Sequence, residues 1–340
     1  MQIALDATYA VDRRPTGVGV YSRRILEGLA TAYPEICWKF CLRPHRFLRG
    51  WKKRWPAHVR RRLLLDSLAV SHDLFHGLNQ RLPRWRPRRA VVTFHDLFVL
   101  TSAYASPEFR RRFSRQARQA AEQADLIIAV SHFTASQLRD LLGVEPARIR
   151  VVHHGVDLPP LPSATREKII LHVGALQIRK NLQPLIRAFE AVPSGWRLVL
   201  VGSRGYGAEQ IIEEALRSRR AQDIELTGYV TQRELEQLYA RASIFAFPSL
   251  DEGFGIPVLE AMAYGLPVLT SNRSALPEAC GESAVLVDPF NQEEITEKLR
   301  WLCLDEEARI RLSQAGRERA RQFSWAKAVE KTWLVYQELL

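Results

Sequence analysis

The sequence has few cysteines, and they form neither a metal site nor a redox pair. Among 340 residues there are four, Cys37, Cys41, Cys280 and Cys303, with no Cys-x-x-Cys pair and no metal-ligand spacing with histidine. This pattern favours reduced thiols over a disulfide framework, and it predicts a cytoplasmic protein.

Long apolar runs are also missing. No segment approaches the roughly 18 uninterrupted apolar residues of a membrane-spanning helix. The first residues, Met-Gln-Ile-Ala-Leu-Asp, lack the charged and apolar regions of a signal peptide. Hydrophobic residues still make up 46% of the chain and charged residues 25%, which excludes a wholly disordered chain. We therefore expect a globular protein that is soluble or attached to a membrane surface.

Acidic residues are scarce in the first half of the chain. Residues 1–165 carry 27 Lys and Arg against 13 Asp and Glu, a net charge of +14, whereas residues 166–340 carry 22 against 24, or −2. The whole excess of +12 therefore belongs to the first half. Such an excess fits nucleic acid, a membrane surface or an anionic small molecule, and composition does not choose among them.

Short apolar runs suited to buried parallel strands alternate with helix-period stretches, and they do so twice. In the first half we expect strands at 3–7, 74–76, 90–94, 126–130 and 149–153, and helices at 21–32, 108–123 and 135–142. In the second half we expect strands at 168–173, 197–201, 224–226, 243–247, 267–270 and 284–287, and helices at 182–191, 209–218, 232–242 and 257–264, with a helical tail over 292–340.

This alternation predicts an α/β fold of two Rossmann-like doubly wound domains, with ligands at the carboxyl ends of the strands. The proline-rich stretch 155–164 is typical of a linker. We expect domains at 1–160 and 161–322, with a C-terminal helix in 323–340 that packs back on the first domain.

The stretch from Phe247 to Gly265 holds the most informative chemical groups. An acidic, glycine-containing turn follows a strand, and Pro257 is suited to the first turn of a helix, whose N–H groups would bind an anion. Glu252 precedes that helix and Glu260 lies about one turn inside it. A carboxylate binds a sugar diol well, because it accepts two hydrogen bonds. On spacing alone, a solvated loop acid and a surface acid explain the two glutamates about equally well.

The order of several motifs resembles that of the family 4 retaining glycosyltransferases, which have the GT-B fold of two Rossmann-like domains facing across a cleft. The Glu252-x7-Glu260 spacing within Asp-Glu-Gly-Phe-Gly-Ile-Pro-Val-Leu-Glu is similar to the signature of that family. The resemblance extends to residues 172–181, 226–230, 240–249 and 265–270, and more loosely to 16–21, 93–97 and 129–134. It implies an enzyme that uses a nucleotide-sugar, with a motif style similar to mannosyltransferases.

The resemblance assigns donor-binding roles to individual residues. Arg179 and Lys180, at the start of a helix, would hold the donor diphosphate, Glu252 would bind hydroxyls of the donor sugar, and Glu260 would bind the ribose diol. Backbone groups near the sugar, the phosphates and the base would come from Phe254, Gly255, Ile256 and Val230. Many relatives have an arginine after the glycine equivalent to Gly174, where this chain has Ala175.

In the first domain the resemblance points to a histidine and two glycines. His95 follows a buried strand and would face the reacting sugar, so His95 and Glu252 are the catalytic candidates. Gly17 and Gly19 are expected in a strand-to-helix loop that approaches phosphate or acceptor closely, although a plain tight turn also explains them.

The expected mechanism follows from what the matching motifs contain. They offer no carboxylate nucleophile, so we expect retention by front-face substitution, in which the leaving phosphate helps to deprotonate the acceptor. There is no Asp-x-Asp motif. Arg179 and Lys180 would neutralise the diphosphate, so no metal and no obligatory cofactor are expected besides a nucleotide-sugar, GDP-mannose or a UDP-hexose.

The basic excess is concentrated in segments that also contain aromatic residues. Residues 43–62 hold nine Lys and Arg and no acid. Farther along the chain, Arg111, Arg115 and Arg118 have the i, i+4 and i+7 spacing of a stripe on one helix face. The expected membrane or acceptor face comprises Arg46, Trp51, Lys52, Lys53, Trp55, Arg111 and Arg115. Basic residues with tryptophan suit an anionic membrane surface, so we expect peripheral binding at the inner face of the cytoplasmic membrane.

Together these features predict a hexosyltransferase of cell-envelope polysaccharide synthesis, with mannose favoured and a glycan or lipid-linked acceptor, of the lipopolysaccharide type. Three alternatives stay open: a catalytically silent GT-B partner subunit, a sugar phosphorylase or epimerase, and a basic nucleic-acid-binding protein. The last lacks a helix-turn-helix, zinc-finger or RNP motif, so we expect no nucleic-acid partner.

Overall fold

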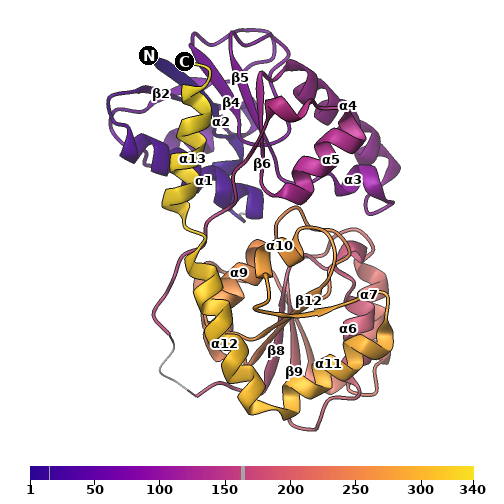
Figure 1. Ribbon diagram of the computed structural model, residues 1–340. Helices are drawn as coiled ribbons and strands as arrows, with labels where there is room; N and C mark the ends of the chain where they lie inside the picture. The colour runs from indigo at the N-terminus through magenta and orange to yellow at the C-terminus, as the bar shows by residue number, and fades with distance from the viewer. Residues whose placement is uncertain (15, 162–164) are drawn as a thin grey trace. The chain divides into compact units, whose positions relative to one another are not determined.

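The computed structural model describes residues 1–14, 16–161 and 165–340. Its contacts divide the chain into two compact units, residues 1–101, 107–155 and 323–340 in the first and residues 102–106 and 156–322 in the second. Each unit contains a parallel sheet with helices packed on it (Figure 1). The expected linker forms no helix or strand in its described part, and its residues 162–164 lie outside the described residues.

The first unit is built on a seven-stranded parallel sheet in the order β3-β2-β1-β4-β5-β6-β7. Its strands are β1 (Gln2–Asp6), β2 (Cys37–Leu42), β3 (Arg60–Leu63), β4 (Leu74–Gly77), β5 (Ala90–Phe94), β6 (Leu126–Ala129) and β7 (Ile149–Val151). Its helices are α1 (Gly17–Ala32), α2 (Pro44–Lys52), α3 (Phe98–Thr101), α4 (Pro107–Gln123), α5 (His132–Leu142) and α13 (Trp325–Gln337).

Alternating side chains of this sheet enter two hydrophobic clusters. Leu5 and Trp38 pack in one cluster with residues of α1 and α13, whereas Phe75 and Val92 pack in the other with residues of α4. The C-terminal helix α13 therefore belongs to the core of the first unit.

A buried chain of hydrogen bonds ties α13 to the sheet. The Tyr336 hydroxyl lies 2.5 Å from His76 Nδ1, and His76 Nε2 lies 2.8 Å from Thr93 Oγ1. The Tyr21 hydroxyl of α1 lies 2.9 Å from the same Thr93 oxygen. Burial lowers the pKa of His76 to about 3, so the imidazole is neutral at pH 7 and joins α13, β4 and β5 without a buried charge.

The second unit is built on a six-stranded parallel sheet in the order β10-β9-β8-β11-β12-β13. Its strands are β8 (Ile169–Val173), β9 (Arg197–Val201), β10 (Ile224–Gly228), β11 (Ile244–Phe247), β12 (Val268–Ser271) and β13 (Val285–Val287). Its helices are α6 (Leu182–Phe189), α7 (Ala208–Arg217), α8 (Gln232–Arg241), α9 (Ile256–Ala263), α10 (Leu276–Cys280), α11 (Gln292–Leu304) and α12 (Glu306–Arg321).

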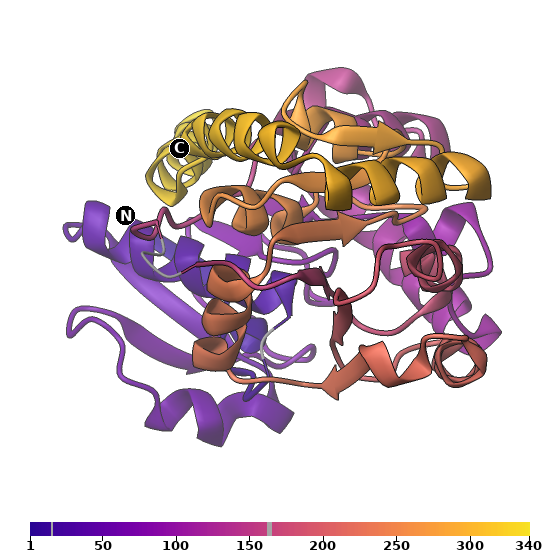
Figure 2. The same ribbon diagram turned by 90° about the horizontal axis from the view of Figure 1, so that it is seen from below.

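Helices cover both faces of this sheet. Helix α11 packs beside α6, and α12 packs against α9 (Figures 1 and 2). The strand order reverses between β8 and β11, as in a Rossmann fold, and this switch point is where open α/β sheets bind their ligands. The six strands expected in this half are all present, and the helical tail forms α11, α12 and α13.

Two further observations concern the cysteines and the membrane. All four cysteines are free, and burial raises the pKa of Cys41, Cys280 and Cys303 to about 12. Among the described residues, no helix is long and apolar enough to cross a membrane.

Candidate functional site

The carboxyl ends of β8 and β11 bring together the basic and acidic residues that the motifs single out. Arg179 and Lys180 lie in a 3₁₀ turn, Ile178–Lys180, that follows β8 and precedes α6. The sequence predicts these two residues at the start of the helix. In the structure they come just before it and do not form its first turn. Glu252 lies in the loop that joins β11 to α9.

Glu252 accepts three contacts on a single carboxylate oxygen. Lys180 Nζ and Ser249 Oγ each lie 2.5 Å from Glu252 Oε1, and Arg179 Nη1 lies 2.8 Å from it. Arg179 also donates to the backbone carbonyl of Asp251. The contacts of Arg179 and Lys180 join segments about 70 residues apart, whereas Ser249 is only three residues from Glu252, and all of these contacts are buried.

These contacts fix the charge of Glu252. Burial alone would raise the pKa of this carboxyl, but Arg179, Lys180 and the bonds from Lys180 and Ser249 lower it to about 2. Glu252 is therefore a carboxylate at neutral pH and serves as a hydrogen-bond acceptor. Two cations beside it lie in a little-hydrated environment, where they act on a neighbouring charge more strongly than in water.

The side chain of Lys180 packs closely against its neighbours. Its Nζ lies 4.5 Å from the centre of the Phe247 ring, on which the His172 ring also stacks. A side chain at Gly174 would come within 3.2 Å of Lys180 Cε, so glycine leaves the room that the lysine stem needs. Burial and the nearby Lys180 lower the pKa of His172 to about 3, and the neutral imidazole adds no repulsion.

Helix α9 begins beside this cluster. Gly255 precedes it with a φ of 103°, in the left-handed region that favours glycine, and a Cβ there would meet Leu276 Cδ2 at 2.8 Å. Phe254 is buried, Ile256 is the first helical residue, and Pro257 occupies the first turn as the sequence indicates. Pro257 has no N–H, and the N–H groups of Val258 and Leu259 donate to the Gly255 carbonyl, so Gly255 and Ile256 are the candidate backbone donors to an anion at this helix start.

Glu260 is placed differently from Glu252. It lies on α9, half-buried, and its Oε2 accepts a hydrogen bond of 3.0 Å from the Tyr239 hydroxyl of α8. Burial raises the pKa of Glu260 to about 7, although the bond from Tyr239 opposes the rise. The two glutamates therefore differ in charge at neutral pH. Val230, expected near the base, lies half-buried between β10 and the start of α8.

His95 lies directly after β5 in the first unit and is buried. Its Nε2 lies 2.9 Å from the carbonyl of Leu78, so this nitrogen carries the proton and donates it. Its ring stacks on His154 at 5.3 Å and meets Tyr21 edge-on. Burial lowers the pKa of His95 to about 4, so the ring is neutral at pH 7.

The structure corrects the expectation for Gly17 and Gly19. Both belong to α1, which begins at Gly17, so neither lies in a loop. Gly17 is exposed at the first position of the helix and Gly19 is buried. The strand-to-helix connection lies before them, and its residue 15 is outside the described residues.

The expected membrane or acceptor face is divided by the fold. Trp55 is only 9% exposed, because its ring packs against Phe40 in the core, which removes it from any surface. Lys53 is half-buried and pairs with Glu27, and Arg46 pairs with Asp12.

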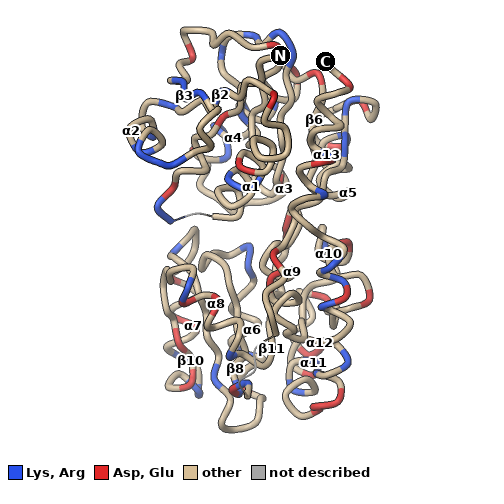
Figure 3. The backbone as a smooth tube through the Cα atoms, turned by 90° about the vertical axis from the view of Figure 1, so that its left-hand side faces the viewer, with Lys and Arg blue, Asp and Glu red and all other residues tan. Residues whose placement is uncertain are grey.

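The remaining residues of this face are exposed. Trp51 and Lys52 lie on α2, and Arg111 and Arg115 lie on α4. Figure 3 shows basic residues gathered along α2 and in the neighbouring segments.

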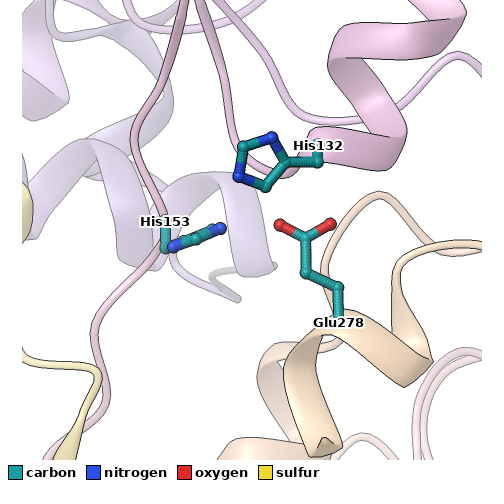
Figure 4. A group of neighbouring side chains, drawn as sticks. All are labelled: His132, His153 and Glu278. Carbon is teal, nitrogen blue, oxygen red and sulfur yellow. The ribbon is translucent and has the colours of Figure 1, made fainter.

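Figure 4 draws His132, His153 and Glu278, three side chains of ligand type. His132 begins α5 and His153 follows β7, and their rings lie edge to face with centroids 5.9 Å apart. Glu278 lies on α10 of the second unit. Two histidines are fewer than the three or four protein ligands of a zinc site, so the pair in the first unit does not make such a site by itself.

Three residues that support the site have no signal in the sequence. Ser249 bonds Glu252, Tyr239 bonds Glu260, and the Ser274 hydroxyl accepts a 3.0 Å bond from the Glu252 backbone N–H. Ser274 has a positive φ of 55°, which is uncommon for a residue other than glycine. Tyr239 and Ser274 reach the two glutamates from positions 21 and 22 residues away in the sequence, which a periodic pattern does not report.

Comparison with known proteins gives the class of the molecule. A model described as "Glycosyl transferases group 1" matches residues 157–319, and one described as "Glycosyltransferase Family 4" matches residues 16–159. The chain is 31% identical over 284 residues to O-antigen chain mannosyltransferase B of Escherichia coli, covering 78% of this chain and 74% of that protein. It is 30% identical over 307 residues to a D-inositol 3-phosphate glycosyltransferase of Corynebacterium jeikeium, covering 79% and 73%.

Solved structures show the same fold. Sucrose-phosphate synthase from Thermosynechococcus elongatus has a TM-score of 0.81 at 23% identity, covering 100% of this chain and 99% of that one. Anabaena HepE in complex with UDP-glucose has a TM-score of 0.78 at 18% identity, covering 99% and 100%. The family models, the relatives and the two Rossmann-like domains thus identify a glycosyltransferase of the GT-B fold. The chain belongs to glycosyltransferase family 4.

Proposed function

We propose that this enzyme transfers a hexose, with mannose favoured, from a nucleotide-sugar to a glycan or lipid-linked acceptor in cell-envelope polysaccharide synthesis. The observation that carries the proposal is the buried cluster of Arg179, Lys180 and Glu252 beside the start of α9. Glycosyl transfer releases a nucleoside diphosphate, whose leaving oxygen becomes negative. Fixed cations and backbone N–H groups stabilise that charge best where water is excluded.

The family resemblance supplies the roles that we propose for the individual residues. Arg179, Lys180 and the N–H groups of Gly255 and Ile256 hold the diphosphate, and the Glu252 carboxylate accepts hydrogen bonds from the sugar hydroxyls. Phe254 lies beside these groups, Glu260 binds the ribose diol, and Val230 offers its backbone to the base.

Transfer proceeds with retention by front-face substitution. His95 of the first domain, neutral and fixed by the bond from its Nε2–H to the Leu78 carbonyl, is the histidine proposed for the reacting sugar; because that nitrogen already donates to Leu78, it is not a general base. The cations take the place of a divalent metal. Activity is therefore expected to survive chelation by EDTA, and activity that vanished with EDTA and returned with manganese would contradict this part. The anomeric configuration of the product, read by NMR, tests retention.

The choice of mannose rests on relatives. Among them are the Escherichia coli O-antigen chain mannosyltransferase B and a serotype-specific mannosyltransferase, WbdA, 28% identical over 268 residues, of which this chain covers 32%. A thermal-shift panel of GDP- and UDP-sugars tests the choice. A donor at 100 times its Kd stabilises the protein by about 2.7 kcal/mol. GDP-mannose should give the largest shift, whereas a larger shift with a UDP-hexose would replace mannose, and no shift with any nucleotide-sugar would contradict the proposal.

We also propose that the first domain binds an anionic membrane surface through α2, at the inner face of the cytoplasmic membrane. Leu48 is 76% and Trp51 is 51% exposed on this short helix, where they are next to Arg49 and Lys52, respectively, in the sequence. Exposed apolar side chains among cations suit a headgroup region. Flotation with anionic vesicles should succeed for the wild type and for the control Leu216→Ser, and should weaken in Leu48→Ser/Trp51→Ser. Equal binding to neutral vesicles, or none to either kind, would contradict the proposal.

A further inference from the structure

A groove of about 940 Å³ runs along α4 on the outside of the first unit. Helix α4 supplies most of its lining, and Val99 and Leu100 of α3 and Leu141 of α5 supply the rest. These three helices lie close together in Figure 1. The volume is within the range of small-molecule sites.

The polar wall of the groove is strongly basic. Arg110, Arg111, Arg115 and Arg118 line it, against a single acid, Glu122. Arg111 pairs at 3.2 Å only with the exposed Glu108, and among the described residues neither Arg115 nor Arg118 has an ion pair. Four guanidinium groups along one helix make an anion the complementary occupant, and guanidinium binds phosphate oxygens in pairs.

The part of the lining that α3 and α5 supply forms an apolar wall. Val99 is buried, and Leu100 and Leu141 are half-buried, so their accessible parts face the groove they line. An inorganic anion would leave this wall in contact with water. A ligand that carries both a phosphate and a hydrocarbon chain would cover both walls.

The direction of α4 relates the groove to the reaction. Helix α3 begins three residues after His95, at the carboxyl edge of the sheet, and α4 ends at Gln123, just before β6 begins at the amino edge. The groove therefore leads away from His95 along the outer surface of the first unit. A molecule lying in it would have one end on the side of the unit where His95 lies.

We propose that this groove binds the phosphate and the first part of the hydrocarbon chain of a lipid-linked acceptor. The inference rests on the proposed function and makes it more specific, because it names a lipid phosphate as the part of the acceptor that is recognised. Arg115 and Arg118 bind the phosphate, and Leu100 and Leu141 contact the chain.

Calorimetry with dodecyl phosphate, below its micelle-forming concentration, tests the proposal. The wild type should bind dodecyl phosphate more tightly than inorganic phosphate or the neutral dodecyl maltoside. In Arg115→Ala/Arg118→Ala the affinity should fall by roughly 30-fold, because each basic residue beside a lipid phosphate contributes about fivefold. Arg112→Ala is the matched control, since Arg112 is exposed on the same helix but does not line the groove. Leu141→Ser should weaken dodecyl phosphate and leave inorganic phosphate unchanged.

Three results would overturn the proposal: no binding of dodecyl phosphate, equal binding of dodecyl maltoside, or an equal loss in Arg112→Ala, which would indicate a diffuse surface for a bilayer. Unchanged melting temperatures separate lost binding from lost folding. GDP and UDP binding, measured on the same variants, should be unaffected. If the wild type binds no nucleotide, the proposed function fails, whereas the groove is judged by the amphiphile alone.

Discussion

Replacing Glu260 by glutamine should change how the stability of the protein depends on pH. The carboxyl is half-buried on α9 and bonded by Tyr239, and burial raises its pKa from 4.5 to about 7. A folded-state pKa above the unfolded one means that the folded protein holds the proton more tightly. The stabilisation is therefore complete below pH 4.5 and is lost as the pH rises through about 7.

The size of the effect follows from the two pKa values. Each tenfold change in proton affinity corresponds to about 1.4 kcal/mol, so the change from 4.5 to about 7 corresponds to about 3 kcal/mol. Glutamine keeps the shape and can accept the bond from Tyr239, but it does not ionise. Between pH 4.5 and pH 8, the stability of Glu260→Gln relative to the wild type should rise by about 3 kcal/mol.

Urea unfolding at a series of pH values measures this difference. The comparison between wild type and variant cancels the other titrating groups, and Glu236→Gln, an exposed acid on α8, is the control. The control should follow the wild type across the range. A Glu260→Gln curve that runs parallel to the wild type from pH 4.5 to pH 8 would refute the assignment of a raised pKa to this carboxyl.

The remaining predictions concern stability. Gly202→Ala should destabilise the protein by about 3 kcal/mol or more, because the new Cβ would lie 2.0 Å from a backbone oxygen. Gly143→Ala, with open space around the new Cβ, should cost only about 1 kcal/mol. Similar melting temperatures for the two variants would contradict this prediction. Tyr336→Phe should lower the stability by about 1–3 kcal/mol, because it leaves His76 Nδ1 without its hydrogen-bond partner at 2.5 Å. Proteolysis should then release α13 faster, and an unchanged cleavage rate would count against the role of this bond. Ser249→Ala should destabilise the protein by a similar free energy, since it removes a hydrogen bond to Glu252. An unchanged melting temperature would show that this bond contributes nothing to stability.

The alternation of strands and helices was sufficient to predict most of the fold. Buried parallel strands are nearly continuous apolar runs, and such runs at 169–173 and 244–247 are visible in the sequence. Strand β2 was missed because Lys39 interrupts its apolar run. The structure accommodates that lysine by bonds to Gln2 and to the carbonyl of Ser71.

The basic stretch 43–62 shows where charge is a poor guide. Its composition predicted a single surface, but the chain forms α2 and the edge strand β3 there. Arg43 is buried between Asp6 and Asp66, and Trp55 packs on Phe40 of the strand that was missed. Burial of these residues depends on a neighbour distant in sequence, so a local pattern does not reveal it.

The sequence singles out the residues of the candidate site, but it does not show their contacts. The Glu252-x7-Glu260 spacing located both acids, and Arg179 and Lys180 came from the family resemblance. Neither source shows that the two cations contact Glu252, which lies about 70 residues later in the sequence, or that the Tyr239 hydroxyl donates a hydrogen bond to Glu260. Such contacts depend on the strand order, in which β8 lies next to β11.

The measurement that tests the central claim most directly is calorimetric titration of GDP and UDP into the wild type and Lys180→Ala. Lys180 lies in the cluster proposed to hold the donor diphosphate, and Arg187→Ala, an exposed cation on α6 of the same unit, is the control. One of the two nucleotides should bind the wild type and the control alike, and about tenfold or more weaker binding is expected for Lys180→Ala, because a charge-assisted bond is lost. Equal binding by Lys180→Ala and the wild type, or no nucleotide binding by the wild type, would contradict the account.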